Sequence, residues 1–290
     1  MKLDIPLILD GKQYAAALRE TLINQCASLT ARCGRPPSLH VLLIGGNPAS
    51  LVYVTMKQKR ACDIGIQSTV HRLADTIDRV SLLKKIFELN NAPHVDGILV
   101  QLPLPAHLDA NEIIEAIAPE KDVDGLTPIN LGRLMRGTPA LVPCTPLGCM
   151  YILKQWRAKL AGLHAVIVGR STLVGQPLAL LLTHSDATVT VCHSRTKDLE
   201  MHTRQADILI AACGSPGLIG AKHVKAGVCV IDVGINRLAD GRLSGDVAFD
   251  EVHPIADAIT PVPFGVGPMT VAYLMSNTIQ AMKASFNHTD

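Results

Sequence analysis

The spacing of apolar residues in the first half of the chain predicts helices and strands in alternation. Between residues 10 and 33 apolar side chains recur at the helical interval, at Leu18, Leu22, Cys26 and Leu29, and Gly34 marks the expected end of that helix. The same criteria predict strands at 39–44, 67–73 and 97–102 and helices at 49–63, 79–89 and 109–117. Such alternation is typical of a parallel sheet covered on both faces.

In the second half of the chain the pattern is first lost and then resumes. Prolines and glycines without an apolar period fill residues 119–143, which indicates a region between domains. A helix over 145–156 is expected to lead into strands at 165–168, 188–192, 208–212 and 228–233, and a long apolar helix over 269–285 is expected to return to the first domain. We therefore predict two α/β domains with parallel sheets and a cleft between them, formed by residues 1–145 plus 269–290 and by residues 146–268.

Residues 164–182, HAVIVGRSTLVGQPLALLL, are the segment around which the second domain is organised. A buried strand leads into a turn with Gly169, Ser171 and Gly175, and a helix is expected to open near Pro177. A helix N-terminus presents free N–H groups and positive potential, and glycine allows a pyrophosphate to approach the backbone. The spacing Gly-x-Ser-x-x-x-Gly is looser than the usual dinucleotide motif, so by itself it is equally compatible with an ordinary strand-to-helix turn.

The residues after the next strand favour the dinucleotide interpretation. Strand 188–192 ends in His193-Ser194-Arg195-Thr196, where a dinucleotide-binding fold places the residue that reads the ribose. No Asp or Glu stands there to accept from a free 2′-hydroxyl. Ser194 and Arg195, with Arg170 from the first turn, provide donors and positive charge that suit a 2′-phosphate. We therefore predict a Rossmann-like domain that binds NADP in preference to NAD.

Composition narrows the class of protein. The chain has 48% hydrophobic and 18% charged residues, as globular proteins do, and its net charge of +2 and 3% aromatic content argue against a nucleic-acid partner. The N-terminal run MKLDIPLILDG is interrupted by Asp4, Pro6 and Asp10, so neither a signal peptide nor a membrane span is expected. The eight cysteines lack C-x-x-C and zinc-type spacings, which is typical of free thiols in the cytoplasm.

Three polar groups of the first domain are candidates for chemistry. Tyr53 and Lys57 share one face of a predicted helix, although spacing alone favours a packing tyrosine and a solvated lysine. Gln101 stands at the end of strand 97–102, where open α/β sheets bind ligands. The run Lys121-Asp122-Val123-Asp124-Gly125 is either a solvated loop or an acceptor site. No His or Cys cluster completes a coordination sphere, so no metal site is predicted.

Taken together, these segments resemble the bifunctional methylenetetrahydrofolate dehydrogenase/methenyltetrahydrofolate cyclohydrolase family. The resemblance extends over nearly the whole chain, and the order and spacing of its motifs are specific. The matching segments are NPASLVYVTMKQKRACDIG (47–65), DGILVQLPLP (96–105), KDVDG (121–125), PCTPLG (143–148), VGRSTLVGQP (168–177), ATVTVCHSRT (187–196), VIDVGIN (230–236), GDV (245–247) and TPVPFGVGPMT (260–270).

The resemblance implies a role for each group of residues. It assigns Tyr53, Lys57, Gln101 and Asp124 to catalysis, with Gln101 hydrogen-bonded to the lysine and Asp124 to the pterin. The expected folate contacts are these four residues with Val100, Leu102, Pro263, Phe264, Gly265, Gly267 and Pro268. The expected NADP contacts are Gly169, Arg170, Ser171, Ser194, Arg195 and Ile235. Members of the family are typically homodimers paired through the nucleotide domain.

The implied reaction oxidises 5,10-methylenetetrahydrofolate to the methenyl compound and hydrolyses that compound to 10-formyltetrahydrofolate, as part of one-carbon folate metabolism. Hydride transfer depends on positioning, whereas the attack of water moves protons and gives a base such as Lys57 a role. Two alternatives remain open. One is a monofunctional dehydrogenase of the same fold, and the other is a non-catalytic protein that senses NADP.

One position departs from the family pattern. The family has the run Pro-Gly-Gly-Val-Gly-Pro, and this chain has Phe264 at the position of its first glycine. An aromatic residue costs roughly 1–2 kcal/mol at positive φ, so we predict that the backbone does not adopt positive φ at Phe264 and that Gly265 carries the constraint. The ring is expected either to face solvent or to stack on the aminobenzoyl ring of the folate, and we favour stacking.

Overall fold

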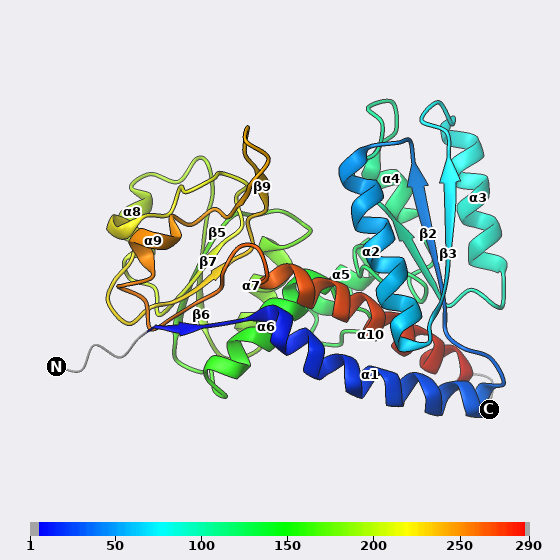
Figure 1. Ribbon diagram of the computed structural model, residues 1–290, viewed down its shortest axis with the longest axis horizontal. Coiled ribbons are helices and arrows are strands. Elements are labelled where there is room, and N and C mark those ends of the chain that lie inside the picture. Colours follow the sequence, from blue (N-terminus) through cyan, green and yellow to red (C-terminus); the bar gives the residue numbers. More distant parts are fainter. Residues whose placement is uncertain (1–5, 288–290) are drawn as a thin grey trace. The chain divides into compact units, whose positions relative to one another are not determined.

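The computed structural model describes residues 6–287, and the chain divides into two compact units. Unit 1 comprises residues 1–16 and 145–270, and unit 2 comprises residues 17–144 and 271–290. Two long helices, α1 (Gly11–Cys33) and α10 (Val266–Asn287), contribute residues to both units, and α6 (Cys144–Trp156) begins at the boundary (Figure 1).

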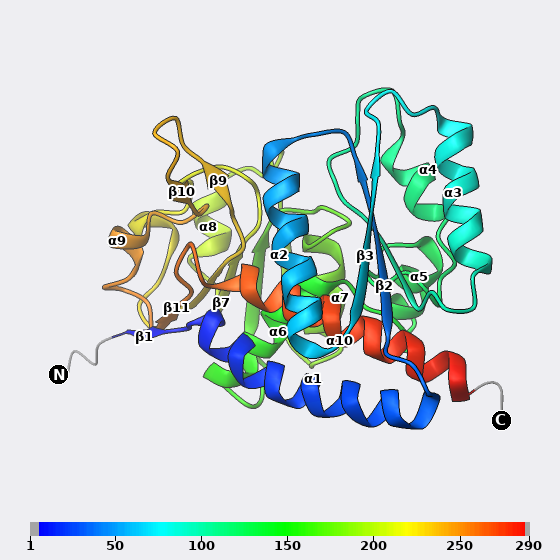
Figure 2. The same cartoon turned by 45° about the vertical axis from the view of Figure 1, so that its right-hand side comes forward.

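Unit 2 is built on a three-stranded parallel sheet in the order β3-β2-β4. Its strands are β2 (Ser38–Ile44), β3 (Gln67–Leu73) and β4 (Gly97–Val100). The helices that follow the strands are α2 (Pro48–Ile64), α3 (Arg79–Asn91), α4 (Ala110–Glu115) and α5 (Pro128–Met135). Figure 2 shows α2 on one side of this sheet and α3 and α4 on the other.

The central strand β2 is buried along its whole length because both faces of the sheet are covered. Leu39, Val41 and Leu43 pack into a cluster with side chains of α1, α2 and α10. Leu42 and Ile44 point the other way, into a second cluster with α3 and α4. The two-residue period of the strand thus divides one apolar run between two cores.

Unit 1 contains a six-stranded parallel sheet in the order β1-β11-β8-β7-β5-β6. Its strands are β1 (Leu7–Ile8), β5 (His164–Val168), β6 (Thr188–Cys192), β7 (Ile208–Ala211), β8 (Cys229–Asp232) and β11 (Ala258–Ile259). Its short helices are α7 (Gly175–Thr183), α8 (Leu199–Thr203) and α9 (Phe249–Val252). The strands β9 (Asn236–Arg237) and β10 (Leu243–Ser244) form a separate hairpin (Figure 2).

The strand order of unit 1 creates a topological switch point. The chain passes from β5 to β6 on one side and then to β7 on the other side of β5. In open α/β sheets a ligand binds beyond the carboxyl ends of the strands at such a point. A binding site of unit 1 is therefore expected at the loops after β5 and β7.

The predicted fold class of two α/β bodies with parallel sheets is confirmed, and most predicted elements appear within two or three residues of their expected ends. The short helix α5 was not predicted, although Thr127 caps it and Pro128 occupies its first turn. None of the helices within residues 6–287 combines the length and apolarity needed to cross a membrane.

The N-terminal segment lies in a different unit from the one predicted. We expected residues 1–145 to fold together, but β1 pairs with β11 of the unit 1 sheet, with Leu7 opposite Ala258. The N–H of Leu9 also donates to the carbonyl oxygen of Ile259 at 2.9 Å. Two paired residues are too short a strand to give a periodic signal in the sequence.

Candidate active site

In unit 2 the structure brings together two of the predicted catalytic residues. Lys57 projects from α2 and its Nζ donates to Oε1 of Gln101 at 3.0 Å. The other end of the Gln101 amide donates to the carbonyl oxygen of Leu102 at 2.7 Å, so both ends of the amide are fixed. Tyr53 lies one helical turn before Lys57, with 36% of its surface exposed. The contact with Gln101 distinguishes Lys57 from an ordinary surface lysine.

The side chains of Lys121 and Asp122, in the loop after α4, stabilise the backbone of this loop and of neighbouring segments. The Lys121 ammonium donates to the carbonyl oxygens of residues 89, 90 and 92, at distances of 2.7–3.2 Å. The buried Asp122 carboxylate accepts from the N–H groups of Gly125 and Thr127 at 2.9 and 2.7 Å and from the Asn130 amide at 3.0 Å. Of the two carboxylates in the predicted acceptor site, Asp122 is therefore structural and Asp124 remains available to a ligand.

Asp124 lies within the electrostatic field of Lys57. Burial raises the pKa of the Asp124 carboxyl, and Asp122 adds to this, while the Lys57 ammonium and the Cys144 thiol lower it. Burial also raises the pKa of the Cys144 thiol well above its usual value, with the Asp124 charge as the next cause. Cys144 is therefore a neutral thiol beside the carboxylate. Within unit 2, Lys57 is thus hydrogen-bonded to Gln101, and its charge acts on Asp124.

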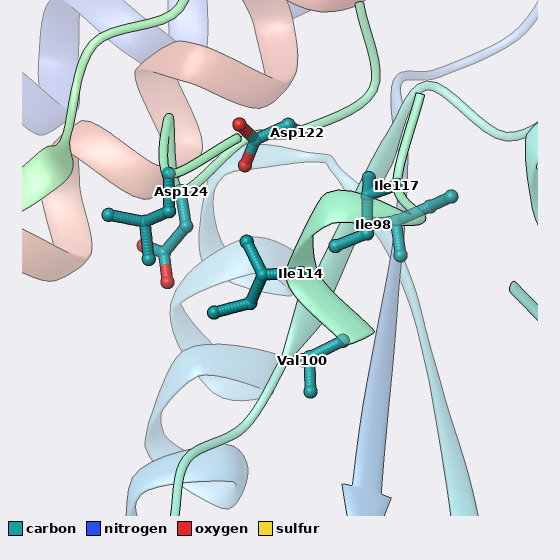
Figure 3. A pocket seen from close by; sticks show the side chains of 7 residues that line it. Ile98, Val100, Ile114, Ile117, Asp122 and Asp124 are labelled. Atoms are coloured by element: carbon teal, nitrogen blue, oxygen red, sulfur yellow. The ribbon is translucent and has the colours of Figure 1, made fainter. Parts of the chain in front are cut away.

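A small cavity of about 10 Å³, enough for a single water molecule, lies beside Asp124. Figure 3 shows Asp124 on one side of it and Ile114 and Val100 on the other. Its remaining lining residues are Ile98, Ile117, Asp122 and Leu126. No group of three or more His, Cys, Asp or Glu side chains suited to a metal ion occurs in the described part of the chain, residues 6–287.

Asn277 is a residue of this site that no sequence pattern singled out. It comes from α10, is 2% exposed, and its Nδ2 donates to the carbonyl oxygens of Val123 and Val142, both at 2.9 Å. Nδ2 also lies 3.5 Å from Sγ of Cys144. This amide joins the segment just before Asp124 to the segment that carries Cys144. Its role depends on contacts more than 130 residues apart, which no local motif reports.

In unit 1 the turn after β5 has the geometry of a phosphate cradle. Gly169 has a φ of 131°, and a Cβ atom there would lie 2.0 Å from the carbonyl oxygen of Ala212, so only glycine fits. The helix α7 begins at Gly175, two residues earlier than predicted, and no side chain caps its first turn. Arg170 and Ser171 are exposed on this turn. The combination is suited to an anion.

The other predicted cofactor residues are also accessible. Ser194 and Arg195 are exposed after β6, and the N–H of Arg195 donates to Nδ1 of His193 at 3.1 Å. Within residues 6–287, neither Arg170 nor Arg195 is engaged in an ion pair with a carboxylate. Ile235, after β8, is 48% exposed. Positive charge therefore remains available where a 2′-phosphate is expected.

The predicted folate contacts of residues 263–268 lie in unit 1, and one prediction about them is wrong. Phe264 has a φ of 84°, whereas Gly265 is not at positive φ. The start of α1 fixes this conformation because the N–H of Lys12 donates to the carbonyl oxygen of Phe264 at 3.1 Å. Gly265 is required for space instead, since a Cβ atom there would lie 2.5 Å from the carbonyl oxygen of Pro261. Pro263 is exposed, and Gly267 and Pro268 belong to the first turn of α10.

The Phe264 ring is 56% exposed, and Nζ of Lys12 lies 5.7 Å from its centroid. The positive φ at this position predicts that a glycine variant is more stable than an alanine variant, the reverse of the usual order. Phe264→Gly should be about 1 kcal/mol more stable than Phe264→Ala, because both variants lose the ring and only glycine adopts positive φ without strain. Urea unfolding of the two variants measures the difference directly.

Phe87 provides the matched control, because it is also exposed, at 68%, but lies in the interior of α3. There the order should reverse, with Phe87→Gly about 1 kcal/mol less stable than Phe87→Ala. Equal stability of the two Phe264 variants, or a more stable alanine variant, would contradict the strained backbone.

Comparison with known proteins identifies relatives over nearly the full length of the chain. The family model described as "Tetrahydrofolate dehydrogenase/cyclohydrolase, catalytic domain" matches residues 9–124, and the model described as "Tetrahydrofolate dehydrogenase/cyclohydrolase, NAD(P)-binding domain" matches residues 143–286. The "Bifunctional protein FolD" of Brevibacillus brevis is 50% identical over 276 residues, which cover 95% of this chain and 97% of the relative.

Two solved structures are similar over nearly their whole length. The bifunctional enzyme FolD (methylenetetrahydrofolate dehydrogenase/cyclohydrolase) from Campylobacter jejuni is 47% identical with a TM-score of 0.94, and the match covers 96% of this chain and 99% of that one. The methylenetetrahydrofolate dehydrogenase-cyclohydrolase (FolD) of Trypanosoma brucei, solved with its NADP cofactor and an inhibitor, is 38% identical with a TM-score of 0.93, with 97% and 98% covered.

Proposed function

Because this chain belongs to the tetrahydrofolate dehydrogenase/cyclohydrolase family, we propose that it catalyses two consecutive reactions on one folate. It oxidises 5,10-methylenetetrahydrofolate with NADP and hydrolyses the methenyl product to 10-formyltetrahydrofolate. The observation that carries this proposal is the hydrogen bond between Lys57 and Gln101 beside Asp124, because it supplies a held amine for the hydrolytic step.

The residues of the turn after β5 fit a phosphorylated dinucleotide. Gly169 leaves the backbone open to a pyrophosphate, the first turn of α7 has no side-chain cap, and Arg170 is exposed. We assign Gly169, Arg170, Ser171, Ser194, Arg195 and Ile235 to the binding of NADP. When bound, NADP supplies the acceptor for the hydride that leaves the methylene carbon. The protein contributes position and alignment to that step.

Asp124 is assigned to the pterin. Its half-buried carboxylate accepts from ring and amino N–H groups of the pterin in charge-assisted hydrogen bonds. Val100 and Leu102 flank Gln101 in the sequence and are assigned to the folate as well. Residues 263–268 are assigned to the remainder of the folate. If the Phe264 ring stacks on the aminobenzoyl group, Phe264→Ala and Phe264→Gly should both raise the Michaelis constant for folate severalfold. An unchanged constant would make the ring a bystander.

Hydrolysis begins when water attacks the methenyl carbon and loses a proton. Lys57 in its neutral amine form takes this proton at Nζ, and Gln101 holds Nζ through its 3.0 Å hydrogen bond. Tyr53, one turn away on the same helix, is assigned to orienting the substrate and the lysine. The bond between the former methenyl carbon and N5 then breaks, N5 takes up a proton as the new hydroxyl group loses one, and the final products are 10-formyltetrahydrofolate and a proton.

A coupled assay tests the proposed function. With 5,10-methylenetetrahydrofolate and NADP⁺, the protein should form NADPH, and with supplied methenyltetrahydrofolate it should accelerate loss of the methenyl absorbance. NADPH formation without accelerated hydrolysis would instead identify a monofunctional dehydrogenase. Binding of NADP⁺ without either reaction would identify a sensing protein.

We further propose a cytoplasmic homodimer paired through unit 1. All eight cysteines are free, which suits a reducing compartment. In the described part of the chain β6 is an edge strand with Val191 38% exposed, and such an edge is available for pairing. A species of monomer mass in sedimentation at assay concentrations would contradict the dimer, and export of the protein from the cytoplasm would contradict the location.

A further inference from the structure

The loops after β7 and β8 are held together by one buried carboxylate, that of Asp246. Its Oδ2 accepts from the backbone N–H groups of Cys213 and Gly214 at 2.7 and 2.9 Å. Its Oδ1 accepts from the N–H of Ser215 and from the side-chain amide of Asn236, both at 2.9 Å. Asp246 has no exposed surface. Because four N–H donors converge on its two oxygens, the negative charge is satisfied entirely within the protein.

A second buried carboxylate fixes Asp246 to the sheet. Asp232 is the last residue of β8, and its Oδ1 accepts from the N–H of Asp246 at 3.0 Å and from that of Gly234 at 2.9 Å. Its Oδ2 accepts from the N–H of Val247 at 3.0 Å. The position of the Asp246 side chain is therefore set by the end of a central strand, not by a free loop.

The two loops that Asp246 joins leave the carboxyl edge of the sheet beside the switch point. Residues 213–215 follow β7, and residues 234–236 follow β8 and include Ile235. Ala212, which precedes the first loop, packs directly against Gly169 of the turn assigned to the pyrophosphate. The loop after β7 thus contacts both the loop after β5 and the loop after β8, at the edge of the sheet where a dinucleotide binds.

We infer that Asp246 is a positioning residue for the dinucleotide cofactor. It acts through the loops at 213–215 and 234–236, which it holds in the conformation that forms the wall of the binding site. This role rests on the proposed use of NADP. Loss of the charge would leave several N–H groups with a weaker acceptor, and the loops would have to be ordered at the moment of binding.

The substitution Asp246→Asn tests this role, because it keeps the shape but places an NH₂ group among N–H donors. The Michaelis constant for NADP⁺ should rise by roughly tenfold or more, the factor expected for loss of charge-assisted bonds. Hydrolysis of supplied methenyltetrahydrofolate uses no dinucleotide, so its rate should change far less. This split separates lost positioning from general unfolding, which would lower both activities together.

Asp207 is the matched control, because it lies at the opposite, amino end of β7. It accepts from the N–H of His164 at 2.8 Å and from Lys225 at 2.7 Å. Asp207→Asn should lower the free energy of unfolding without raising the Michaelis constant for NADP⁺. If Asp246→Asn does not fold, Asn236→Ala tests the role of Asp246 instead. It removes a single hydrogen bond to Asp246 and should raise the Michaelis constant for NADP⁺ severalfold.

Three outcomes would overturn the role of Asp246. The first is an unchanged Michaelis constant for NADP⁺ in a folded Asp246→Asn variant. The second is an equal rise of that constant in Asp207→Asn. The third, where only Asn236→Ala folds, is an unchanged constant in Asn236→Ala. A wild-type protein that forms no NADPH would contradict the proposed function itself, so the two failures can be told apart.

Discussion

Replacement of Lys57 by methionine should separate the two activities. Methionine keeps much of the bulk of the side chain and removes the amine that donates to Gln101 at 3.0 Å. Because only the attack of water requires proton transfer, cyclohydrolase activity should fall by about 10²–10⁴-fold, the range for a lost acid–base group. Dehydrogenase activity should fall less. Methenyltetrahydrofolate should then accumulate and be visible by its absorbance during turnover.

Lys59→Met provides the control for this experiment. Lys59 lies on the same helix and is exposed, and it should tolerate the same change with both activities intact. Hydrolysis at the wild-type rate in Lys57→Met would refute the assignment of Lys57 as the base. A proportional loss of both activities would indicate that Lys57 positions the folate.

Removal of the Arg170 side chain should weaken the binding of NADP⁺ far more than the binding of NAD⁺. Arg170 is exposed on the turn after β5, and the predicted partner of its guanidinium is the 2′-phosphate, which NAD⁺ lacks. Loss of a charge-assisted phosphate contact costs roughly 1.5–3 kcal/mol, so Arg170→Ala should reduce the affinity for NADP⁺ by about tenfold to over a hundredfold. Titration of both dinucleotides against the variant measures the ratio.

Arg204→Ala is the matched control, because Arg204 is also exposed in unit 1 but stands at the end of α8. It should leave the affinities for both dinucleotides unchanged. Equal weakening of NADP⁺ and NAD⁺ by Arg170→Ala, or a preference of the wild-type protein for NAD⁺, would show that Arg170 does not read the 2′-phosphate.

The local elements of this protein could be predicted from the sequence because their signals are short-range. The period of apolar residues identified β2, β3 and most helices within two or three residues of their ends. The turn at Gly169 could also be recognised, since its need for glycine comes from its own backbone and one neighbouring carbonyl. The alignment of Tyr53 and Lys57 on one face of α2 follows from helix geometry alone.

The selection among candidate groups depended on contacts between distant segments. Spacing did not distinguish Asp122 from Asp124, and only the fold shows that backbone N–H groups use the first. The partner of Lys57 is 44 residues away, and Asn277 reaches Val142 across 135 residues. No periodic pattern encodes such pairs.

Local propensity and periodicity were therefore enough to predict the two parallel α/β bodies, the glycine turn and the set of polar candidates. Which of these candidates meet depends on the folded chain. Folding placed β1 in the sheet of unit 1, buried Asp246 beneath two loops, and held Phe264 at a φ of 84°. The physical reason is the same in each case. The deciding hydrogen bond or close contact comes from a remote segment that local patterns do not report, and at Phe264 it accompanies a backbone conformation that costs about 1–2 kcal/mol.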